Sequence, residues 1–224
     1  SCLFVPSAQR KGMVITMKEA LIYVGGEIDP AGVFPRPGAD TLTIAADSGY
    51  RTAQTLGVTP KILLGDFDSL QDVPQAMEIV RFPAHKDYTD GQLALSLAIE
   101  RGAQKITLIG GLGGRVDHTL SCLAMLEQLF RNGLCGCVCN GKNEVRYLRG
   151  PASAAVAADA NYPYLSLIAL DEALRNVTIE GCEYPLHAAT ILRREQFAIS
   201  NRIIQKQAKI TIGQGAAYLI RSGD

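Results

Sequence analysis

The residues best suited to chemistry are two aspartates, Asp66 and Asp68, which follow Gly65 at the end of a short apolar run at residues 62–64. Such a run is typical of a buried strand. In an extended chain, residues two apart point the same way, with side chains roughly 6–7 Å apart. Like charges that close repel unless a cation lies between them. The pair therefore predicts a Mg²⁺ site. For the pair alone, an acidic turn with Ser69 as a helix cap is the alternative.

Other acidic residues also lie just after a predicted strand or just before a predicted helix. Asp47 comes after an apolar segment at residues 41–46. Asp87 and Asp90 lie just before a helical segment and are three residues apart, so they can share a face. Open α/β sheets bind ligands beyond the carboxyl ends of their strands, and these carboxylates fall there. We therefore expect one acidic rim that binds a divalent cation.

A glycine-rich segment at residues 110–114 is suited to binding an anion, where the acidic rim is suited to binding a cation. Glycines such as Gly113 and Gly114 let the backbone approach a phosphate closely, and a helix opening near Asp117 directs free amides toward it. Arg115 can add a bidentate contact. By itself the segment is equally compatible with a plain tight turn. The sequence contains no Gly-x-x-x-x-Gly-Lys-Ser/Thr loop, so this is not a P-loop protein. Carboxylates together with phosphate donors indicate a nucleoside triphosphate and group transfer.

Alternating strands and helices must position these residues in the first part of the chain. This alternation predicts βαβ units and a mainly parallel sheet. Thr89 and Gln92 fit a capping box at the start of one helix. Leu120, Leu123, Ala124 and Leu126 are predicted to form the apolar stripe of another. The predicted strands cover residues 20–24, 41–46, 61–64 and 105–109, and the predicted helices cover residues 50–56, 89–101 and 117–132.

After about Asn140 the pattern changes to short strands separated by Gly, Pro and Asn. No long helix is expected there, so we predict a small all-β domain. Residues 213–215 are predicted to form a hairpin turn that joins the last two strands. The alanine-rich residues 151–160 are interpreted as a loop or an irregular strand edge. The predicted strands are residues 145–148, 164–169, 177–179, 197–200, 209–212 and 217–220.

Composition limits the classes of function. The 224 residues include 47% hydrophobic and 20% charged residues, with 22 basic against 22 acidic side chains. There is no basic block, which argues against a nucleic-acid surface. No apolar run approaches the roughly 20 residues of a membrane span. His118 is expected to serve local structure. Cys135, Cys137 and Cys139 alternate, which favours reduced, buried cysteines on one strand face over a zinc site, and hence a cytoplasmic protein.

Three linked acidic motifs resemble those of thiamine pyrophosphokinases. They are LGDFDSL at residues 64–70, KDYTD at residues 86–90 and GGRVDH at residues 113–118, in matching order and spacing. Two later segments, EGCEYPL at residues 180–186 and ISN at residues 199–201, resemble the thiamine-side motifs of that family. The resemblance spans roughly residues 20 to 221.

The resemblance implies an α/β domain with a mainly parallel, Rossmann-like sheet at residues 17–140 and a β-sandwich domain at residues 141–224. Residues 1–16 would be an extension, with Met13 or Met17 as the natural start. The resemblance also implies a homodimer with active sites at the subunit interface. From the composition, no nucleic-acid or membrane partner is expected. The reaction would transfer the terminal diphosphate of ATP to the hydroxyl of thiamine, giving thiamine diphosphate and AMP.

The resemblance also implies a role for each motif residue. Metal binding and catalysis would fall to Asp66, Asp68 and Asp90. Arg115 and Asp117 would act at the phosphates with Asp87 and the backbone of Gly113 and Gly114, and Asp47 would help to bind the nucleotide. Ser200 and Asn201 would contact thiamine.

The chain departs from the family pattern mainly on the acceptor side. Cys182, Glu183 and Arg202 replace the usual residues there, and Tyr50 and Arg51 alter the continuation of the first motif. Two alternatives stay open, the first because of these departures. One is a Mg²⁺-dependent diphosphotransferase that acts on another hydroxylated heterocycle. The other is a nucleotide- or thiamine-binding sensor without turnover.

Overall fold

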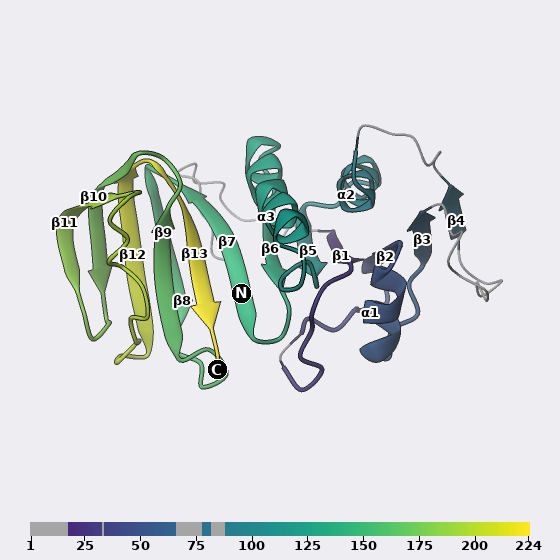
Figure 1. Cartoon of the computed structure of the whole chain (residues 1–224), viewed down its shortest axis with the longest axis horizontal. Coiled ribbons are helices and arrows are strands. Elements are labelled where there is room, and N and C mark those ends of the chain that lie inside the picture. Colours follow the sequence, from purple (N-terminus) through teal and green to yellow (C-terminus); the bar gives the residue numbers. More distant parts are fainter. Residues whose placement is uncertain (1–17, 33, 66–77, 82–87) are drawn as a thin grey trace, which may run out of the picture. The chain divides into compact units, whose positions relative to one another are not determined.

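The computed structural model describes residues 18–32, 34–65, 78–81 and 88–224 (Figure 1). The chain forms two compact units, one ending at Gly141 and the other running from Lys142 to Asp224. The predicted residues Asp66, Asp68 and Asp87 lie outside the described residues.

The first unit is built on a parallel sheet, as the alternation of strands and helices predicts. Its strand order is β4-β3-β2-β1-β5-β6, and all neighbouring strands are parallel. The order reverses beside β1, because the chain adds β2 to β4 on one side and then returns to place β5 on the other. The strands are β1 (Glu19–Tyr23), β2 (Leu42–Ala46), β3 (Ile62–Gly65), β4 (Glu78–Arg81), β5 (Lys105–Ile109) and β6 (Cys135–Cys139).

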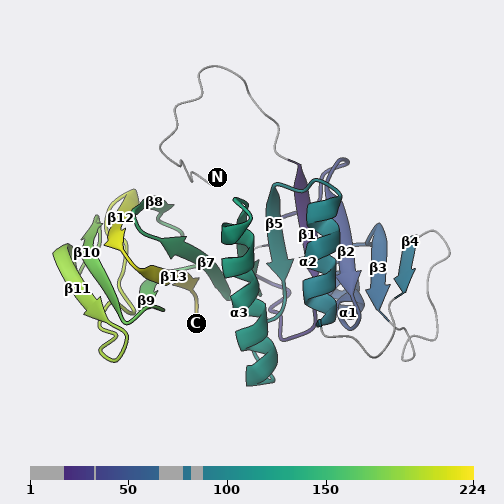
Figure 2. The same ribbon diagram turned by 90° about the horizontal axis from the view of Figure 1, so that it is seen from above.

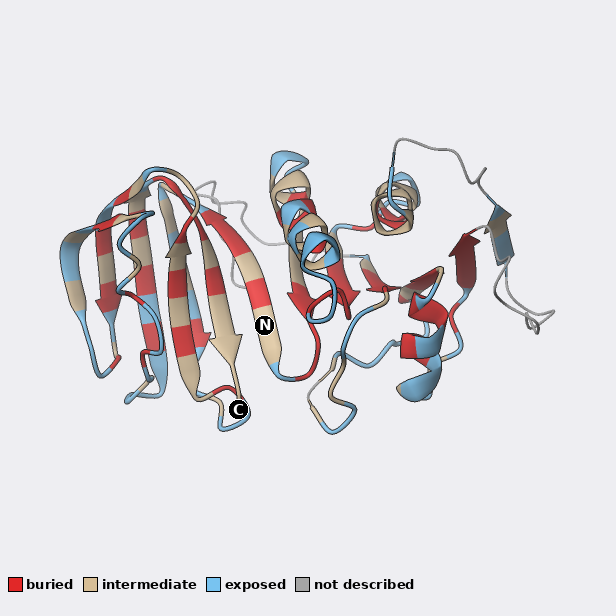
Figure 3. Cartoon of the chain, viewed as in Figure 1, coloured by how far each residue is buried: buried red, intermediate tan, exposed pale blue. Residues whose placement is uncertain are grey.

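Helices cover both faces of this sheet. They are α1 (Gly49–Thr55), α2 (Asp90–Glu100) and α3 (Val116–Arg131). Figure 1 shows α1 on one face and α2 and α3 on the other, and α2 contacts β1 and β2 (Figure 2). Tyr23 and Leu63 pack with Tyr50 and Ala53 of α1. With both faces covered, β1, β2, β3 and β5 are almost wholly buried, as Figure 3 shows, which explains their continuous apolar sequences.

The buried face of α3 differs from the predicted one. Cys122, Met125, Leu126 and Leu129 are buried, whereas Leu120 is 61% exposed. Ala124 is exposed as well. Of the predicted stripe only Leu126 belongs to the core. The prediction was wrong because Cys and Met, which pack well in cores, were left out of the helical pattern.

The predicted capping box at the start of α2 is confirmed. The Gln92 backbone N–H donates to the Thr89 hydroxyl at 3.2 Å, and the Thr89 N–H donates to the Gln92 side-chain oxygen at 2.9 Å. Two otherwise unpaired donors at the helix end are thereby satisfied. This cap fixes the residue that follows it, Asp90, at the first position of the helix.

We expect Thr89→Ala to destabilise the first unit by about 1 kcal/mol, because the N-cap acceptor is lost. The measurement is the free energy of unfolding from urea titration. Thr55→Ala is the matched control, since the Thr55 hydroxyl donates to the Arg51 carbonyl within α1 and caps nothing. Equal losses in the two variants would contradict a capping role for Thr89.

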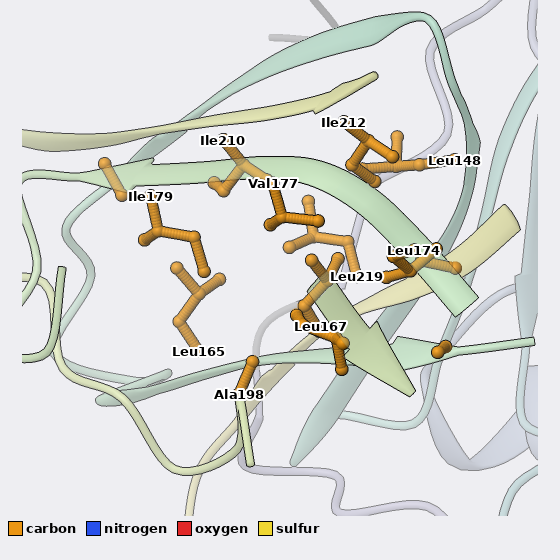
Figure 4. Packing of buried hydrophobic residues seen from close by; sticks show 14 of the residues in the cluster. Leu148, Leu165, Leu167, Leu174, Val177, Ile179, Ala198, Ile210, Ile212 and Leu219 are labelled. Carbon is orange, nitrogen blue, oxygen red and sulfur yellow. The ribbon is translucent and has the colours of Figure 1, made fainter. Parts of the chain in front are cut away.

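The second unit contains two antiparallel sheets and no helix within residues 142–224. One sheet has the order β7-β13-β9 and the other β11-β10-β12-β8. Leu148, Leu167 and Leu219 of the first pack against Val177 and Ile210 of the second, and Figure 4 shows this core. The strands are β7 (Asn143–Arg149), β8 (Ala152–Ala157), β9 (Tyr164–Ala169), β10 (Ala173–Glu180), β11 (Leu186–Leu192), β12 (Gln207–Gln214) and β13 (Ala216–Ser222).

Three details of this unit correct the sequence interpretation. Residues 213–215 are not a hairpin turn: β12 pairs with β10 and β8, and β13 pairs with β7 and β9, so the chain crosses from one sheet to the other. Residues 197–200 are not a strand, although the Ala198 carbonyl accepts a hydrogen bond from Leu167. The alanine-rich segment contains a regular edge strand, β8. The strands β4 and β11 had not been predicted.

Two expectations about composition can be compared with the structure. None of the five described cysteines forms a disulfide, and Cys139 packs in the core on the α1 face of the sheet. In the part of the chain that the structure describes, every helix is too short or too polar to cross a membrane.

Candidate functional site

A pocket of about 340 Å³ lies beyond the carboxyl ends of the central strands of the first unit. Residues just after β1, β2 and β5 form one side of it, and the beginnings of α2 and α3 form the other. This is the place where the strand order reverses, which is where open α/β sheets bind ligands. Val24, Cys122 and Met125 give the pocket apolar surface, whereas Asp47, Asp90 and His118 are among its polar groups.

Asp47 enters the pocket wall through an unusual backbone conformation. Its φ is 45°, in the left-handed region that Asp tolerates better than most residues. Its N–H donates to the Leu64 carbonyl at 2.8 Å, and its own carbonyl accepts from Tyr50 at 3.0 Å. The turn also needs Gly49, since a Cβ there would lie 2.0 Å from the Tyr23 carbonyl oxygen. The structure therefore places Asp47 at the pocket, as the acidic rim requires.

The start of α2 contributes the second acidic group of the wall, Asp90, held by the capping box. Tyr88 lies beside it and is 62% exposed, so an aromatic face borders the opening. Gly91 leaves space for Met125, whose terminal carbon would lie 3.1 Å from an added Cβ.

The glycines of the glycine-rich turn fall into two groups, one at the pocket and one outside it. Gly111 lines the pocket, with φ at 72° and Cys122 Sγ only 2.3 Å from where a Cβ would stand. Gly113 and Gly114, predicted to bind phosphate, do not line the pocket and lie against Glu27. The Gly114 N–H donates to Glu27 Oε1 at 3.1 Å. One of the predicted backbone donors is thus bound to a carboxylate of the chain itself.

Arg115 and Asp117 form a bidentate ion pair where α3 begins. Arg115 Nη2 lies 2.6 Å from Asp117 Oδ2, and Arg115 Nε lies 3.1 Å from Oδ1. Asp117 also accepts the backbone N–H of His118 at 3.0 Å. The Arg115 hydrogen bonds are the main cause that lowers the pKa of Asp117 from 3.8 to about 2. Both side chains are largely exposed, so the pair is available to a ligand.

The pKa of Asp117 provides a direct test of this pairing. Because its pKa is lowered in the folded state, the stabilisation is present above about pH 3.8 and is lost as the pH falls toward 2. Replacing Arg115 by Gln should raise the pKa of Asp117 toward 3.8. Carbon NMR titration of the carboxyl group measures both values. An unchanged pKa in Arg115→Gln would show that the pair does not form.

The two described acids of the pocket do not complete a metal site. Within residues 18–32, 34–65, 78–81 and 88–224, no three His, Cys, Asp or Glu side chains gather as metal ligands. The carboxylates of Asp47 and Asp90 are nevertheless the hard oxygen donors that suit Mg²⁺. The remaining predicted ligands, Asp66 and Asp68, follow β3 at Gly65.

In the second unit, Asn201 has a defined structural task. It is buried, and its amide nitrogen donates to the Tyr184 carbonyl at 2.7 Å. Its oxygen accepts the N–H groups of Tyr184 at 3.0 Å and Arg202 at 2.9 Å. Ser200 has φ at 54° and donates its N–H to Ser166 Oγ at 3.0 Å. Asn201 thus fixes the loop that carries Tyr184, whose side chain is 63% exposed.

Sequence reasoning missed several residues of the first unit's site. His118, expected to serve local structure, lines the pocket, as do Cys122 and Met125. The positions of Cys122 and Met125 one helical turn apart were a usable signal. Glu27 carried no such signal, because its contact with Gly114 joins residues 87 positions apart.

The fold and site define a two-unit protein with a ligand pocket at the switch point of a parallel sheet and a separate all-β unit. Residues 38–136 match the family described as "Thiamin pyrophosphokinase, catalytic domain", and residues 155–216 match "Thiamin pyrophosphokinase, vitamin B1 binding domain". The chain is 30% identical over 190 residues to thiamine pyrophosphokinase of Bacillus subtilis, an alignment that covers 82% of this chain and 88% of the relative.

Solved structures agree with these matches. The crystal structure of thiamine pyrophosphokinase from Bacillus subtilis superposes with a TM-score of 0.82 at 27% identity, covering 92% of this chain and all of that one. That of the enzyme from Geobacillus thermodenitrificans has a TM-score of 0.79 at 30% identity, covering 92% and 98%. The chain belongs to the thiamine pyrophosphokinase family.

Proposed function

We propose that the pocket of the first unit binds ATP with Mg²⁺, and that the enzyme transfers the terminal diphosphate to the hydroxyl of thiamine, giving thiamine diphosphate and AMP. The observation that carries the proposal is the placement of Asp47 and Asp90 in a pocket at the carboxyl ends of β1, β2 and β5, in a chain of this family. Carboxylates can serve the negatively charged phosphates only through a bound Mg²⁺, and the base of the nucleotide requires apolar surface such as Val24 and Met125.

The metal would be held by Asp66, Asp68 and Asp90. Their carboxylates match the oxygen donors that Mg²⁺ prefers. When bound, Mg²⁺ neutralises charge on the phosphate oxygens. Asp90 itself is positioned before any ligand arrives, because the capping box fixes the start of α2. Its carboxylate could also orient the attacking hydroxyl.

The phosphates would be bound at the start of α3. Arg115 uses Nε and Nη2 on Asp117, which leaves Nη1 to donate to a phosphate oxygen. Asp117 thereby acts through Arg115 by fixing its plane. Asp47 and Asp87 would contribute on the nucleotide side, together with the glycine backbone. Phosphoryl transfer depends mainly on such positioning and electrostatics, so a strong general base is not required.

The first unit would bind ATP and Mg²⁺, and the second would bind thiamine. The order reversal beside β1 supports describing residues 17–140 as a Rossmann-like ATP and Mg²⁺ domain, and residues 141–224 as the thiamine-binding sandwich. Ser200 would contact thiamine, and Asn201 would also hold the Tyr184 loop. We further propose a cytoplasmic homodimer with the active site at the subunit interface, in line with the lack of a disulfide among the five described cysteines and with the family resemblance.

A panel of acceptors tests the proposal against its alternatives. The protein is mixed with ATP and Mg²⁺ and either thiamine or another hydroxylated heterocycle, and AMP is measured. We expect AMP formation with thiamine well above that with any other alcohol. A higher rate with another heterocycle would show that this heterocycle, and not thiamine, is the preferred acceptor. Binding of ATP or thiamine without AMP from any mixture would indicate a sensor instead.

A further inference from the structure

The side chain of Glu27 joins two loops that come from different parts of the sequence. Its backbone N–H donates to the Leu112 carbonyl at 3.0 Å, and its carboxylate accepts the Gly114 N–H at 3.1 Å. Next to these bonds, the Gly111 N–H donates to the Gly25 carbonyl at 2.7 Å. Three hydrogen bonds therefore tie the loop after β1 to the loop after β5. Both loops form the pocket wall, at Gly25 and Gly111.

The carboxylate lies directly over the glycine turn. A Cβ added to Gly113 would stand 2.8 Å from both the carboxyl carbon and Oε2 of Glu27, so a larger residue there would require the Glu27 side chain to move. Gly113 and Gly114 have φ of 78° and 66°, both in the left-handed region. A backbone N–H in a turn can bind an anion, as the Gly114 N–H does here. The anion in that position is the chain's own carboxylate.

The same turn is held from its other side by α3. The Thr119 hydroxyl donates to the Gly113 carbonyl at 3.3 Å. Arg115 follows the turn directly and forms its pair with Asp117 in the first turn of α3. Glu27 and Thr119 thus hold the same peptide group, Gly113–Gly114, from its two sides, and this peptide directly precedes Arg115.

We propose that Glu27 is a positioning residue for the phosphate side of the reaction. It holds the turn at residues 112–115 in one conformation, so that Arg115 and the start of α3 are in place before ATP binds. Without this anchor the consecutive glycines sample other conformations, and ATP must select the competent one. Apparent affinity falls in proportion to the fraction of competent molecules. The identity of the ligand rests on the proposed function; the ordering of the turn does not.

Three variants test the proposal. Glu27→Ala removes the acceptor, Glu27→Gln keeps an oxygen acceptor without the charge, and Asp40→Ala removes an exposed acid elsewhere in the first unit. For Glu27→Ala we expect the Kd for ATP with Mg²⁺, measured by calorimetry, and the KM for ATP to rise about five- to tenfold, with kcat changed less than about threefold. Glu27→Gln and Asp40→Ala should stay within about twofold of the unmodified protein.

Amide hydrogen exchange of residues 112–116 without ligand gives a readout that does not depend on activity. We expect faster exchange in Glu27→Ala and unchanged exchange in Glu27→Gln and Asp40→Ala. Unchanged exchange or unchanged affinity in Glu27→Ala would overturn the proposal. Tighter ATP binding would overturn it too, since the carboxylate would then compete with phosphate. So would equal loss in Glu27→Gln, which would assign the effect to charge. A protein that forms no AMP would refute the proposed function, while the exchange result would still decide the role of Glu27.

Discussion

Replacing Asp90 by Asn should reduce kcat for AMP formation by about a hundredfold or more, with the fold intact. Asn has the same shape but lacks the negative charge that a Mg²⁺ ligand supplies, and metal-linked charge stabilisation is worth several kcal/mol, which corresponds to about 10²–10³ in rate. The substitution should leave the start of the helix unchanged, since the capping box is formed by Thr89 and Gln92 and does not use the Asp90 side chain. The comparison is made at saturating ATP and thiamine.

Glu100→Gln is the matched control for this variant. Glu100 is the last residue of the same helix, exposed and at the far end from the pocket. The change also removes one carboxylate charge, so it controls for the general field of α2. A similar loss of kcat in Glu100→Gln would show that the helix's charge, and not the pocket carboxylate, matters. Near-normal kcat in Asp90→Asn would show that Asp90 is not a metal ligand.

The largest effect is expected for Asp66→Asn and Asp68→Asn, each with turnover reduced by about a thousandfold or more. Both residues lie outside the described residues, and we expect this effect from their motif and from its position after β3. β3 ends at Gly65, and Asp47 at the end of the neighbouring strand is in the pocket wall. Carboxyl ends of neighbouring parallel strands meet at one edge of a sheet.

Metal dependence distinguishes loss of a ligand from general damage. AMP formation is measured against Mg²⁺ concentration in Asp66→Asn and Asp68→Asn, and thermal unfolding is measured for both. We expect residual activity to need more Mg²⁺ than the unmodified protein, with the melting temperature unchanged. Near-normal rates in both variants would eliminate the metal-site proposal, and a collapsed melting temperature would indicate a structural role.

Much of the first unit could be predicted because its signals are local. Buried parallel strands produce continuous apolar runs, as at residues 62–64, and Thr89 with Gln92 encodes a helix start within four residues. β4 was missed because Glu78 and Arg81 give it the composition of a surface segment, and the strand is in fact mostly exposed. The face of α3 was mistaken at Leu120 because Cys122 and Met125, which mark the buried face, were left out of the helical pattern.

The second unit shows what local patterns cannot determine. The glycines at residues 213 and 215 look like a hairpin turn, yet pairing is decided by distant strands, and β12 and β13 join different sheets. β8 was left uncertain because alanine carries no strand preference; its pairing with β12 decides its conformation.

The site was predicted in the same uneven way. Asp47 and Asp90 were found because carboxylates after strands or before helices fall on one edge of a sheet. Glu27 and His118 required the structure, because their neighbours come from other elements. The carboxylate of Glu27 accepts the N–H of Gly114, so this predicted phosphate donor is already bound within the chain.

Product analysis of one reaction tests the central claim most directly. The protein is incubated with ATP, Mg²⁺ and thiamine, and AMP, ADP, phosphate and thiamine diphosphate are quantified together, with a parallel mixture lacking thiamine. Transfer of the diphosphate predicts AMP and thiamine diphosphate in equal amounts, and neither without thiamine. ADP with thiamine monophosphate, or AMP in the absence of thiamine, would contradict it.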